Sequence, residues 1–170
     1  MAAELPAPRR PGHYRVALVC LGNICRSPIA EVVLRSLLAD AGLGDRVEVA
    51  SSGTGDWHVG DPMDRRAAAT LAAHGYDASA HRAQQFQPSW LDDCDVVLAM
   101  DSANRSEVGA GTDGRVLMFR DFDPRAGEDD LDVPDPYYGA DDGFEHVLGI
   151  VRRTSAEIVG RLEELVGAQG

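Results

Sequence analysis

A cysteine and an arginine stand six positions apart near the start of the sequence, at Cys20 and Arg26. The thiolate form of cysteine is the nucleophile, and it forms more readily beside a cation or a helix N-terminus. The planar fork of arginine can hold two oxygens of a phosphoryl group, which the point charge of lysine does less well. This pair therefore predicts a site that binds a small dianion and attacks it, with Cys20 as the nucleophile.

The residues between the pair suit a loop that binds an anion through its backbone. Gly22 and Asn23 tolerate unusual φ values, so the chain can turn tightly and point its N–H groups inward. A helix that starts directly after the loop adds positive potential. The alternative is a purely structural turn. The residues expected to contact a bound phosphate are Leu21, Gly22, Asn23, Ile24, Cys25 and Arg26.

The segments on either side must hold this loop in place. Residues 14–19 are mostly apolar and partly β-branched, which is typical of a strand buried on both faces. After the loop, Ser27 is predicted to be a helix N-cap with Pro28 in the first helical position. Apolar residues then recur at helical spacing through residue 41. The Ser27 hydroxyl is also a candidate hydrogen-bond donor to the Cys20 thiolate.

Strands that alternate with helices along the chain predict an α/β sandwich around a parallel sheet. The expected strands are residues 14–20, 46–50, 94–100 and 115–118. The expected helices are residues 28–41, 64–74, 90–93, 102–108 and 142–166. Ligand sites of open α/β sheets lie at the carboxyl ends of the strands, and Cys20 stands at such an end.

Composition and charge narrow the class of protein. A chain of 170 residues predicts one domain, at residues 13–170, preceded by a flexible tail at residues 1–12 that is rich in proline and arginine. The net charge of −12 does not suggest a surface that binds nucleic acid. No apolar run reaches transmembrane length and no signal-peptide core is present, so we expect no membrane insertion. Three cysteines suggest neither a disulfide scaffold nor a structural zinc site.

Residues 121–143 show no convincing periodicity, and a loop this long in a small domain is usually functional or disordered. The stretch is rich in acidic residues, most of which must be solvated. Asp135 differs because a proline stiffens the chain on each side of it, and Tyr137 and Tyr138 follow. The residues alone rank Asp135 first as a candidate acid and leave the other carboxyl groups open.

The run VCLGNICRSPIAE at residues 19–31 resembles the signature loop of the low-molecular-weight protein tyrosine phosphatases. Further matching segments are SSGT at 51–54, WHVG at 57–60, AMD at 99–101 and DPYYG at 135–139. The resemblance covers the chain from about residue 14 onward and is strongest to actinobacterial members. It implies a three-layer α/β/α sandwich with a four-stranded parallel sheet, of the flavodoxin-like, phosphotyrosine phosphatase I type.

The resemblance also implies the chemistry. Cys20 attacks phosphorus and forms a cysteinyl-phosphate, Arg26 and the loop N–H groups bind the equatorial oxygens, and Asp135 protonates the phenolate leaving group. The implied enzyme is a protein-tyrosine-phosphatase that hydrolyses aryl phosphate monoesters with no metal or cofactor. Supporting roles fall to Ser51, placed beneath the loop with a hydrogen bond to Asn23, and to a histidine at or near His81.

Several aromatic and acidic residues keep two interpretations. The resemblance places Trp57 at the entrance of the cleft, with Tyr137 and Tyr138 as further cleft residues, whereas the residues alone allow Trp57 to cover the edge of the core equally well. Asp101 stands at the end of a predicted strand, where it is either a site residue or the cap of the helix that follows. The resemblance also implies that a cognate kinase phosphorylates Tyr137 and Tyr138, which the sequence alone would describe only as cleft aromatics.

The second cysteine of the loop, Cys25, also has two interpretations. It either captures an oxidised Cys20 in a reversible disulfide or is a small buried thiol. The main alternative activity is a thiol-dependent arsenate reductase of the same fold, which needs a further cysteine to relay a disulfide, and Cys94 is the only spare one. A phosphate-binding module without catalysis is the third possibility, which intact Cys20, Arg26 and Asp135 disfavour.

The expected partners are proteins that carry phosphotyrosine, together with a cognate tyrosine kinase. A monomer is expected. A reducing cytoplasm suits a free nucleophilic thiol, and export without a signal peptide stays open.

Overall fold

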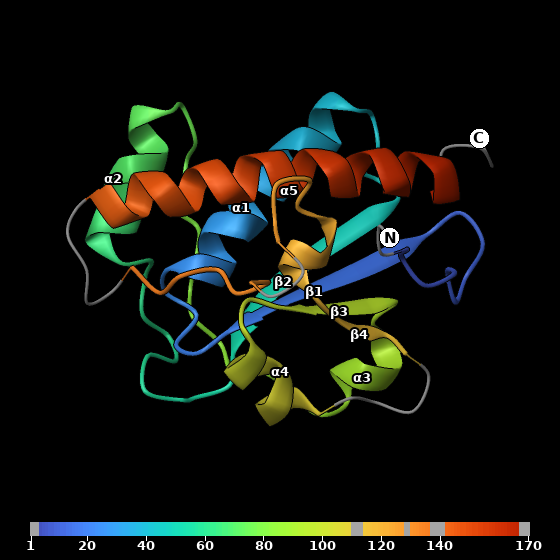
Figure 1. Ribbon diagram of the computed structural model, residues 1–170, viewed down its shortest axis with the longest axis horizontal. Helices are drawn as coiled ribbons and strands as arrows, with labels where there is room; N and C mark the ends of the chain where they lie inside the picture. The colour runs from blue at the N-terminus through green and yellow to red at the C-terminus, as the bar shows by residue number, and fades with distance from the viewer. Residues whose placement is uncertain (1–3, 110–113, 128–129, 137–141, 167–170) are drawn as a thin grey trace.

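A four-stranded parallel sheet lies at the centre of the computed structural model, in the order β2-β1-β3-β4 (Figure 1). The structure describes residues 4–109, 114–127, 130–136 and 142–166. The strands are β1 Tyr14–Cys20, β2 Val47–Gly53, β3 Val96–Ala99 and β4 Val116–Met118. Because every pairing is parallel, the carboxyl ends of the strands meet at one edge of the sheet.

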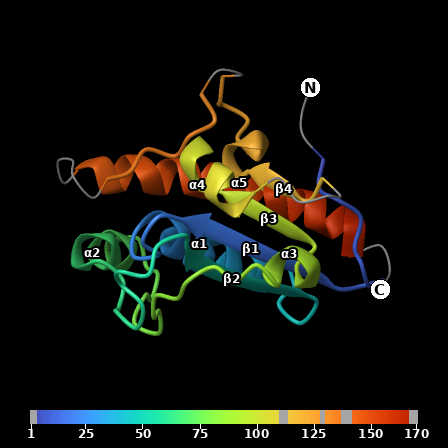
Figure 2. The same cartoon turned by 90° about the horizontal axis from the view of Figure 1, so that it is seen from below.

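Helices cover both faces of this sheet (Figures 1 and 2). The helices are α1 Arg26–Asp40, α2 Arg65–Ala73, α3 Trp90–Asp93, α4 Ser102–Val108 and α5 Asp142–Val166, with a 3₁₀ helix, η1, at Phe119–Phe122. Helices α1 and α5 pack on one face with α2 beside them, and α3 and α4 pack on the other. The predicted three-layer α/β/α sandwich is confirmed.

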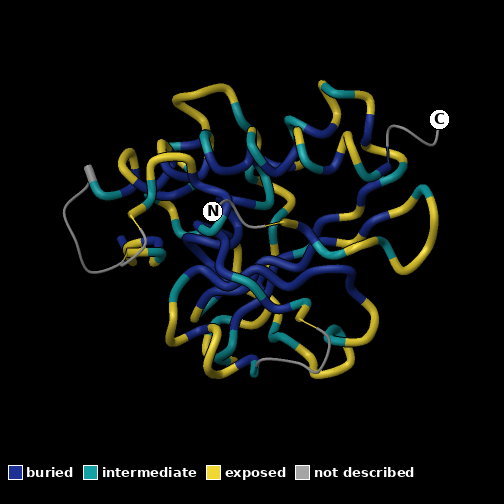
Figure 3. The backbone as a smooth tube through the Cα atoms, turned by 45° about the vertical axis from the view of Figure 1, so that its right-hand side comes forward, coloured by how far each residue is buried: buried dark blue, intermediate teal, exposed yellow. Residues whose placement is uncertain are grey.

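The central strand β1 is buried on both faces, as its sequence predicts. Its alternate residues Tyr14, Val16 and Leu18 join the core under α1 and α5, whereas Ala17 and Val19 join a smaller core under α3 and α4. The buried chain runs through the middle of the molecule, and exposed residues gather in the connecting loops (Figure 3). Apolar burial on both faces fixes the position at which β1 delivers the residues that follow it.

Several element boundaries differ from the sequence-based expectations. The helix α1 begins at Arg26, with Cys25 in the cap position and no side-chain cap, so the prediction of Ser27 as N-cap and Pro28 as first helical residue is wrong. The strand β2 continues to Gly53, because it pairs with β1 as far as Cys20, and residues 84–86 pair with its other side at Gly53. The strand β3 starts only at Val96, since the residues before it close α3.

Residues 5–9 lie against the amino ends of the strands. Leu5 is buried in the main core, and the hydroxyl group of Tyr14 donates a hydrogen bond to the carbonyl of Pro6 at 2.8 Å. The backbone N–H of Arg9 donates to Asp95 Oδ1 at 2.7 Å, and its guanidinium donates to Cys94 O at 3.0 Å. The expected division into a flexible tail at residues 1–12 and a domain at 13–170 stays a prediction.

Candidate active site

A cavity of about 420 Å³ opens at the carboxyl end of β1, where the parallel sheet was expected to carry its ligand site. The described residues that line it are Cys20, Leu21, Gly22, Ile24, Cys25, Arg26, Trp57, His58 and Asp135. The predicted nucleophile, anion ligand and acid therefore share one cavity, although Asp135 is more than one hundred positions from Arg26 in the sequence.

The backbone of the loop from Cys20 to Arg26 turns its carbonyl groups outward. Four of them accept hydrogen bonds from neighbouring segments: Cys20 from Thr54 N (2.9 Å), Leu21 from Gly55 N (3.0 Å), Asn23 from His81 Nε2 (2.7 Å) and Ile24 from Asp64 N (2.9 Å). In a planar trans peptide the N–H points opposite to the C=O. The N–H groups of the same peptides are therefore directed toward the inside of the loop, where an anion can bind them.

The side chain of Asn23 fixes the shape of the loop from within. Asn23 has a φ of 59°, and its amide group donates to Ser27 Oγ and to Ser51 Oγ, both at 2.9 Å. Its Oδ1 atom accepts the backbone N–H of Gln84 at 2.9 Å. The contact with Ser51 is the one that the resemblance implies. Gly22 does not adopt a positive φ, and a Cβ at this position would lie 3.1 Å from the His58 ring, so the ring would have to shift slightly to admit one.

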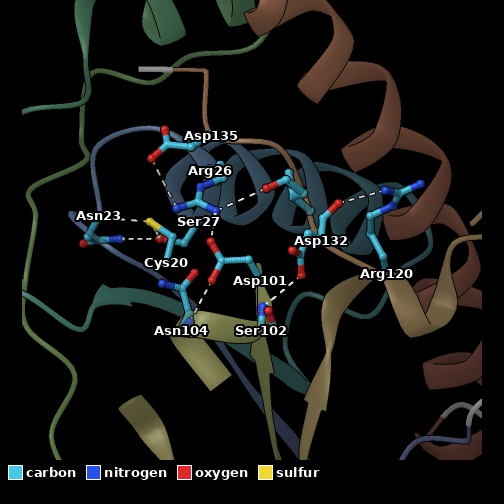
Figure 4. Close-up of polar contacts among 11 residues, drawn as sticks. Cys20, Asn23, Arg26, Ser27, Asp101, Ser102, Asn104, Arg120, Asp132 and Asp135 are labelled. Atoms are coloured by element: carbon cyan, nitrogen blue, oxygen red, sulfur yellow. Dashed lines mark hydrogen bonds and ion pairs between the residues drawn. The ribbon is translucent and has the colours of Figure 1, made fainter. Parts of the chain in front are cut away.

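The thiol of Cys20 is buried at the base of the cavity among hydrogen-bond donors. Its Sγ atom accepts the N–H of Asn23 at 3.3 Å and lies 3.0 Å from Ser27 Oγ (Figure 4). Both groups can donate to a thiolate, and the guanidinium of Arg26 and the first turn of α1 add positive potential. The hydroxyl group of Ser27 thus faces the nucleophile instead of capping the helix.

Arg26 is almost completely buried and is held by two carboxylates. Its Nη1 atom donates to Asp101 Oδ2 at 2.6 Å and to Val133 O at 3.2 Å, and its Nη2 atom lies 3.5 Å from Asp135 Oδ2 (Figure 4). Burial by itself would lower the pKa of Arg26, but the negative charges of Cys20, Asp101 and Asp135 raise it above its ordinary value. The guanidinium is therefore a permanent, oriented cation at the cavity wall.

Asp101 serves both of the roles that the sequence left open. Its Oδ1 atom accepts the backbone N–H of Asn104 at 2.7 Å and so caps α4, while its Oδ2 atom pairs with Arg26. A carboxylate that caps a helix has a fixed direction, because the cap bond uses backbone geometry. Asp101 consequently orients the guanidinium from the strand β3 side of the site.

Asp135 and Trp57 form the outer part of the cavity. The side chain of Asp135 is 34% exposed, and it points toward Arg26 (Figure 4). Trp57 is 69% exposed and lies at the rim, so the interpretation that it covers the edge of the core is wrong. Tyr137 and Tyr138, the other expected cleft residues, lie outside the described residues.

The remaining two cysteines have different surroundings. Cys25 is buried in the loop, and burial, with the nearby charges of Asp64, Cys20 and Asp135, raises the pKa of its thiol well above the ordinary value. Burial likewise raises the pKa of Cys94 to about 11. Since Val16 lies opposite Val96 in the sheet, Cys94 is level with the start of β1. Cys20 is at the other end of β1, so at ~3.3 Å per strand residue Cys94 is about 20 Å from Cys20.

Among the described residues, no group of three or more histidine, cysteine, aspartate or glutamate side chains could hold a metal ion. The same residues contain no helix that is long and apolar enough to cross a membrane. A larger hollow of about 650 Å³ lies at the outer edge of β2, far from Cys20. Two of its charged residues, Arg15 and Glu48, pair with each other.

Some residues that shape the site were not found from the sequence. The ion pair between Arg26 and Asp101 joins residues 75 positions apart, and the only signal was the place of Asp101 at the end of a strand. The backbone of Gln84 and the ring of His58 contact the loop, and nothing in their local sequence distinguishes them.

Comparison with known proteins gives a consistent result. The sequence profile described as "Low molecular weight phosphotyrosine protein phosphatase" matches residues 15–167. A low molecular weight protein-tyrosine-phosphatase of Streptomyces coelicolor is 47% identical, with 90% of this chain and 96% of the relative aligned. Low molecular weight protein-tyrosine phosphatase A of Mycobacterium tuberculosis is 42% identical, with 91% and 95% aligned.

Solved structures of other proteins superimpose on the fold of this chain over most of its length. The crystal structure of YfkJ from Bacillus subtilis superimposes with a TM-score of 0.83 at 31% identity, covering 91% of this chain and 98% of that one. A protein tyrosine phosphatase from Entamoeba histolytica, with Hepes in its active site, gives a TM-score of 0.82 at 30% identity and covers 89% and 97%. The chain therefore belongs to the low molecular weight phosphotyrosine protein phosphatase family.

Proposed function

We propose that this protein hydrolyses phosphotyrosine in proteins by way of a cysteinyl-phosphate intermediate. The observation that carries the proposal is the shared cavity, in which a buried thiol, a loop of inward N–H groups, Arg26 and an accessible carboxyl group surround one space. These are the parts that phosphoryl transfer needs: a nucleophile, a cradle for three equatorial oxygens and an acid for the leaving group.

In the first step the Cys20 thiolate attacks phosphorus in line with the phenolic oxygen. The loop N–H groups and the Arg26 guanidinium bind the equatorial oxygens and stabilise the charge of the transition state. The bond between phosphorus and the phenolic oxygen breaks as the sulfur–phosphorus bond forms. Asp135, protonated at this stage, transfers its proton to the departing oxygen, so the product leaves as tyrosine.

In the second step a water molecule attacks the cysteinyl-phosphate. The ionised Asp135 accepts a proton from this water, the sulfur–phosphorus bond breaks, and inorganic phosphate is released. The sulfur leaves as a thiolate, which the Ser27 hydroxyl group and the Asn23 N–H stabilise by hydrogen bonds. The enzyme returns to its starting state without a metal or a cofactor.

The depth of the site supports a preference for aryl phosphates. Cys20 is 3% exposed at the base of the cavity, whereas Trp57 stands at the rim. A phosphotyrosine side chain spans that depth, while phosphoserine is several bonds shorter. Trp57 can stack on the phenyl ring, and the exposed side chain of Leu21 extends the apolar wall. We assign Tyr137 and Tyr138 to the same cleft from the resemblance.

The membership of the family implies phosphoproteins as substrates. We propose a cognate tyrosine kinase as a further partner, acting on Tyr137 and Tyr138, and a monomeric state. A cytoplasmic location agrees with the three cysteines of the chain, which are all free thiols.

The arsenate reductase alternative lacks the cysteine relay that it requires. A disulfide needs Cα atoms within about 7 Å. Cys94, the only cysteine outside the loop, lies at the amino end of β3, whereas Cys20 ends β1. The relatives named above are phosphatases, and this alternative is not favoured.

The proposal is tested by hydrolysis of para-nitrophenyl phosphate with a chelator present. We expect Cys20→Ser to abolish activity. Asp135→Ala should lower kcat by about 10²-fold, the lower end of the usual contribution of a general acid, because para-nitrophenol is a good leaving group. Cys94→Ser is the matched control and should retain full activity. A freshly reduced wild type without activity, or an active Cys20→Ser variant, would exclude the proposed mechanism.

A further inference from the structure

Asp135 belongs to residues 130–136, a segment without helix or strand that we call the acid segment. Three hydrogen bonds hold the middle of the acid segment: Ser102 N to Asp132 Oδ1 (2.9 Å), Val133 N to Met100 O (2.7 Å) and Arg26 Nη1 to Val133 O (3.2 Å). Because Asp135 lies only two residues beyond Val133, the position of its carboxyl group depends on how firmly this middle part is held.

A fourth contact comes from Arg120, which lies in the 3₁₀ helix η1 and is 8% exposed. Its Nη1 atom donates to the carbonyl oxygen of Asp132 at 2.8 Å, and its Nε atom donates to Asp123 Oδ2 at 3.0 Å (Figure 4 shows the first of these). The guanidinium is a rigid fork, so fixing its Nε atom also fixes the direction of its Nη1 atom.

The anchor of this fork, Asp123, is a fully buried carboxylate. Besides Arg120 it accepts two hydrogen bonds from Arg153 of helix α5, at 2.8 and 3.0 Å, and one from the backbone N–H of Arg125 at 2.9 Å. Burial would raise the pKa of Asp123, but the hydrogen bonds from Arg153, Arg125 and Arg120 outweigh it, and the pKa lies below its ordinary value. Asp123 is therefore charged and immobile at neutral pH.

We propose that Arg120 is a positioning residue for the general acid. It ties the acid segment, through the carbonyl of Asp132, to the buried pair formed by Asp123 and Arg153, and so keeps Asp135 on the Arg26 side of the cavity. Arg120 itself is not one of the described residues that line the cavity. The inference rests on the proposed function, because it concerns how that reaction obtains its proton.

The leaving group distinguishes this role from a merely structural one. A general acid matters most when the departing phenol holds its proton tightly, as the tyrosine phenol does with a pKa of about 10. It matters less for para-nitrophenyl phosphate, whose phenol is more acidic. The parameter kcat/KM reports the reaction up to release of the phenol, so its ratio between the two substrates measures the alignment of Asp135.

The experiment compares kcat/KM for phosphotyrosine and para-nitrophenyl phosphate in wild type, Arg120→Lys and Asp135→Asn. Lysine keeps the charge but cannot hold Asp123 and Asp132 in one rigid geometry. We expect Arg120→Lys to lose about tenfold on phosphotyrosine and less than about threefold on para-nitrophenyl phosphate, with Asp135→Asn showing the same pattern more strongly. Arg125→Lys, whose side chain is exposed in the same region, should change neither value.

Inhibition by inorganic phosphate and the thermal midpoint report whether the loop and the fold are intact. If Arg120→Lys does not fold, Asp123→Asn, which weakens the anchor at nearly constant shape, gives the same test. Equal losses on both substrates, or no loss, in a folded variant would overturn the inference alone. A wild type that hydrolyses neither substrate would overturn the proposed function as well.

Discussion

Arg26 shows how much of the site is in place before a substrate arrives. The side chain is buried, and a buried cation is costly unless it is paired and hydrogen-bonded. Asp101, Asp135 and the Val133 carbonyl supply those partners. The guanidinium therefore needs no reorientation when a phosphoryl group enters, which is the condition under which electrostatic stabilisation is most effective.

The position of Cys25 in the same loop as the nucleophile leads to a prediction about recovery from oxidation. Its raised pKa keeps it a neutral thiol, so it does not compete with Cys20 as nucleophile, yet both lie in one short loop. If Cys25 captures the sulfenic acid of Cys20 as a disulfide, irreversible oxidation is prevented. After a peroxide pulse followed by a thiol reductant, Cys25→Ser should recover several-fold less activity than wild type. Cys94→Ser serves as the control, and equal recovery of all three proteins would contradict the protective role.

At the scale of elements, the end of β2 lies directly against the loop from Cys20 to Arg26. Gly53 is the last residue of β2 and pairs with Cys20 across the sheet. A Cβ at this position would lie 2.7 Å from the carbonyl oxygen of Leu21 and 3.0 Å from the carbonyl carbon of Gly22. These neighbours are backbone atoms, which cannot move aside as a flexible side chain would. The absence of a side chain thus sets the distance between the strand and the loop.

Substitution of Gly53 by alanine should therefore displace the loop. We expect Gly53→Ala to lower kcat/KM by about 10- to 100-fold, since a displacement near 1 Å is enough to cost about that much. Inhibition by inorganic phosphate should weaken in parallel, because the loop binds the same anion. Gly44→Ala is the control, because a Cβ there would make only an ordinary van der Waals contact, 4.0 Å from the Cα atom of Ala39. Unchanged phosphate inhibition in Gly53→Ala would refute the steric argument.

The local parts of the site could be predicted from the sequence because they are consecutive in it. Cys20, Arg26 and the turn between them are one run of residues. The nucleophilic thiol and the cationic guanidinium can be recognised from their residue types alone. The N-cap was misassigned because Ser27 has the right residue type, but its hydroxyl group is used by Cys20 and Asn23. Arg120 and Asp123 are only three positions apart. Their other partners, Asp132 and Arg153, follow no spacing rule, since tertiary packing alone brings them to this pair.

At the scale of the whole molecule, Asp123 joins α5 to the acid segment. Its carboxylate has a pKa below the unfolded value of about 3.9. A lowered pKa means that folding favours the charged form, so this contribution to stability is present above about pH 4 and is lost as the pH falls through the folded-state pKa. The long C-terminal helix is thereby held to the catalytic side of the molecule by a charge that acid removes.

This gives a pH-dependent prediction for Asp123→Asn. At pH 7 the free energy of unfolding should fall by about 3 kcal/mol, the lower end of the cost of breaking a buried ion pair. At acid pH, where wild type is also protonated at this position, the difference should shrink. Urea unfolding at the two pH values measures this difference, with Asp45→Asn, at an exposed position, as the control. A difference that stays constant across the pH range would contradict the assignment.

The docking of residues 5–9 has a practical consequence for how the protein can be attached to surfaces. These residues contact the amino ends of the strands, and Val166, at the end of α5, accepts a hydrogen bond from Arg46 just before β2. Both described ends of the chain thus lie about 20 Å from the cavity, the length of β1 at ~3.3 Å per residue. A fluorescent partner or a solid support joined at either end leaves the mouth of the cavity open to a large phosphoprotein.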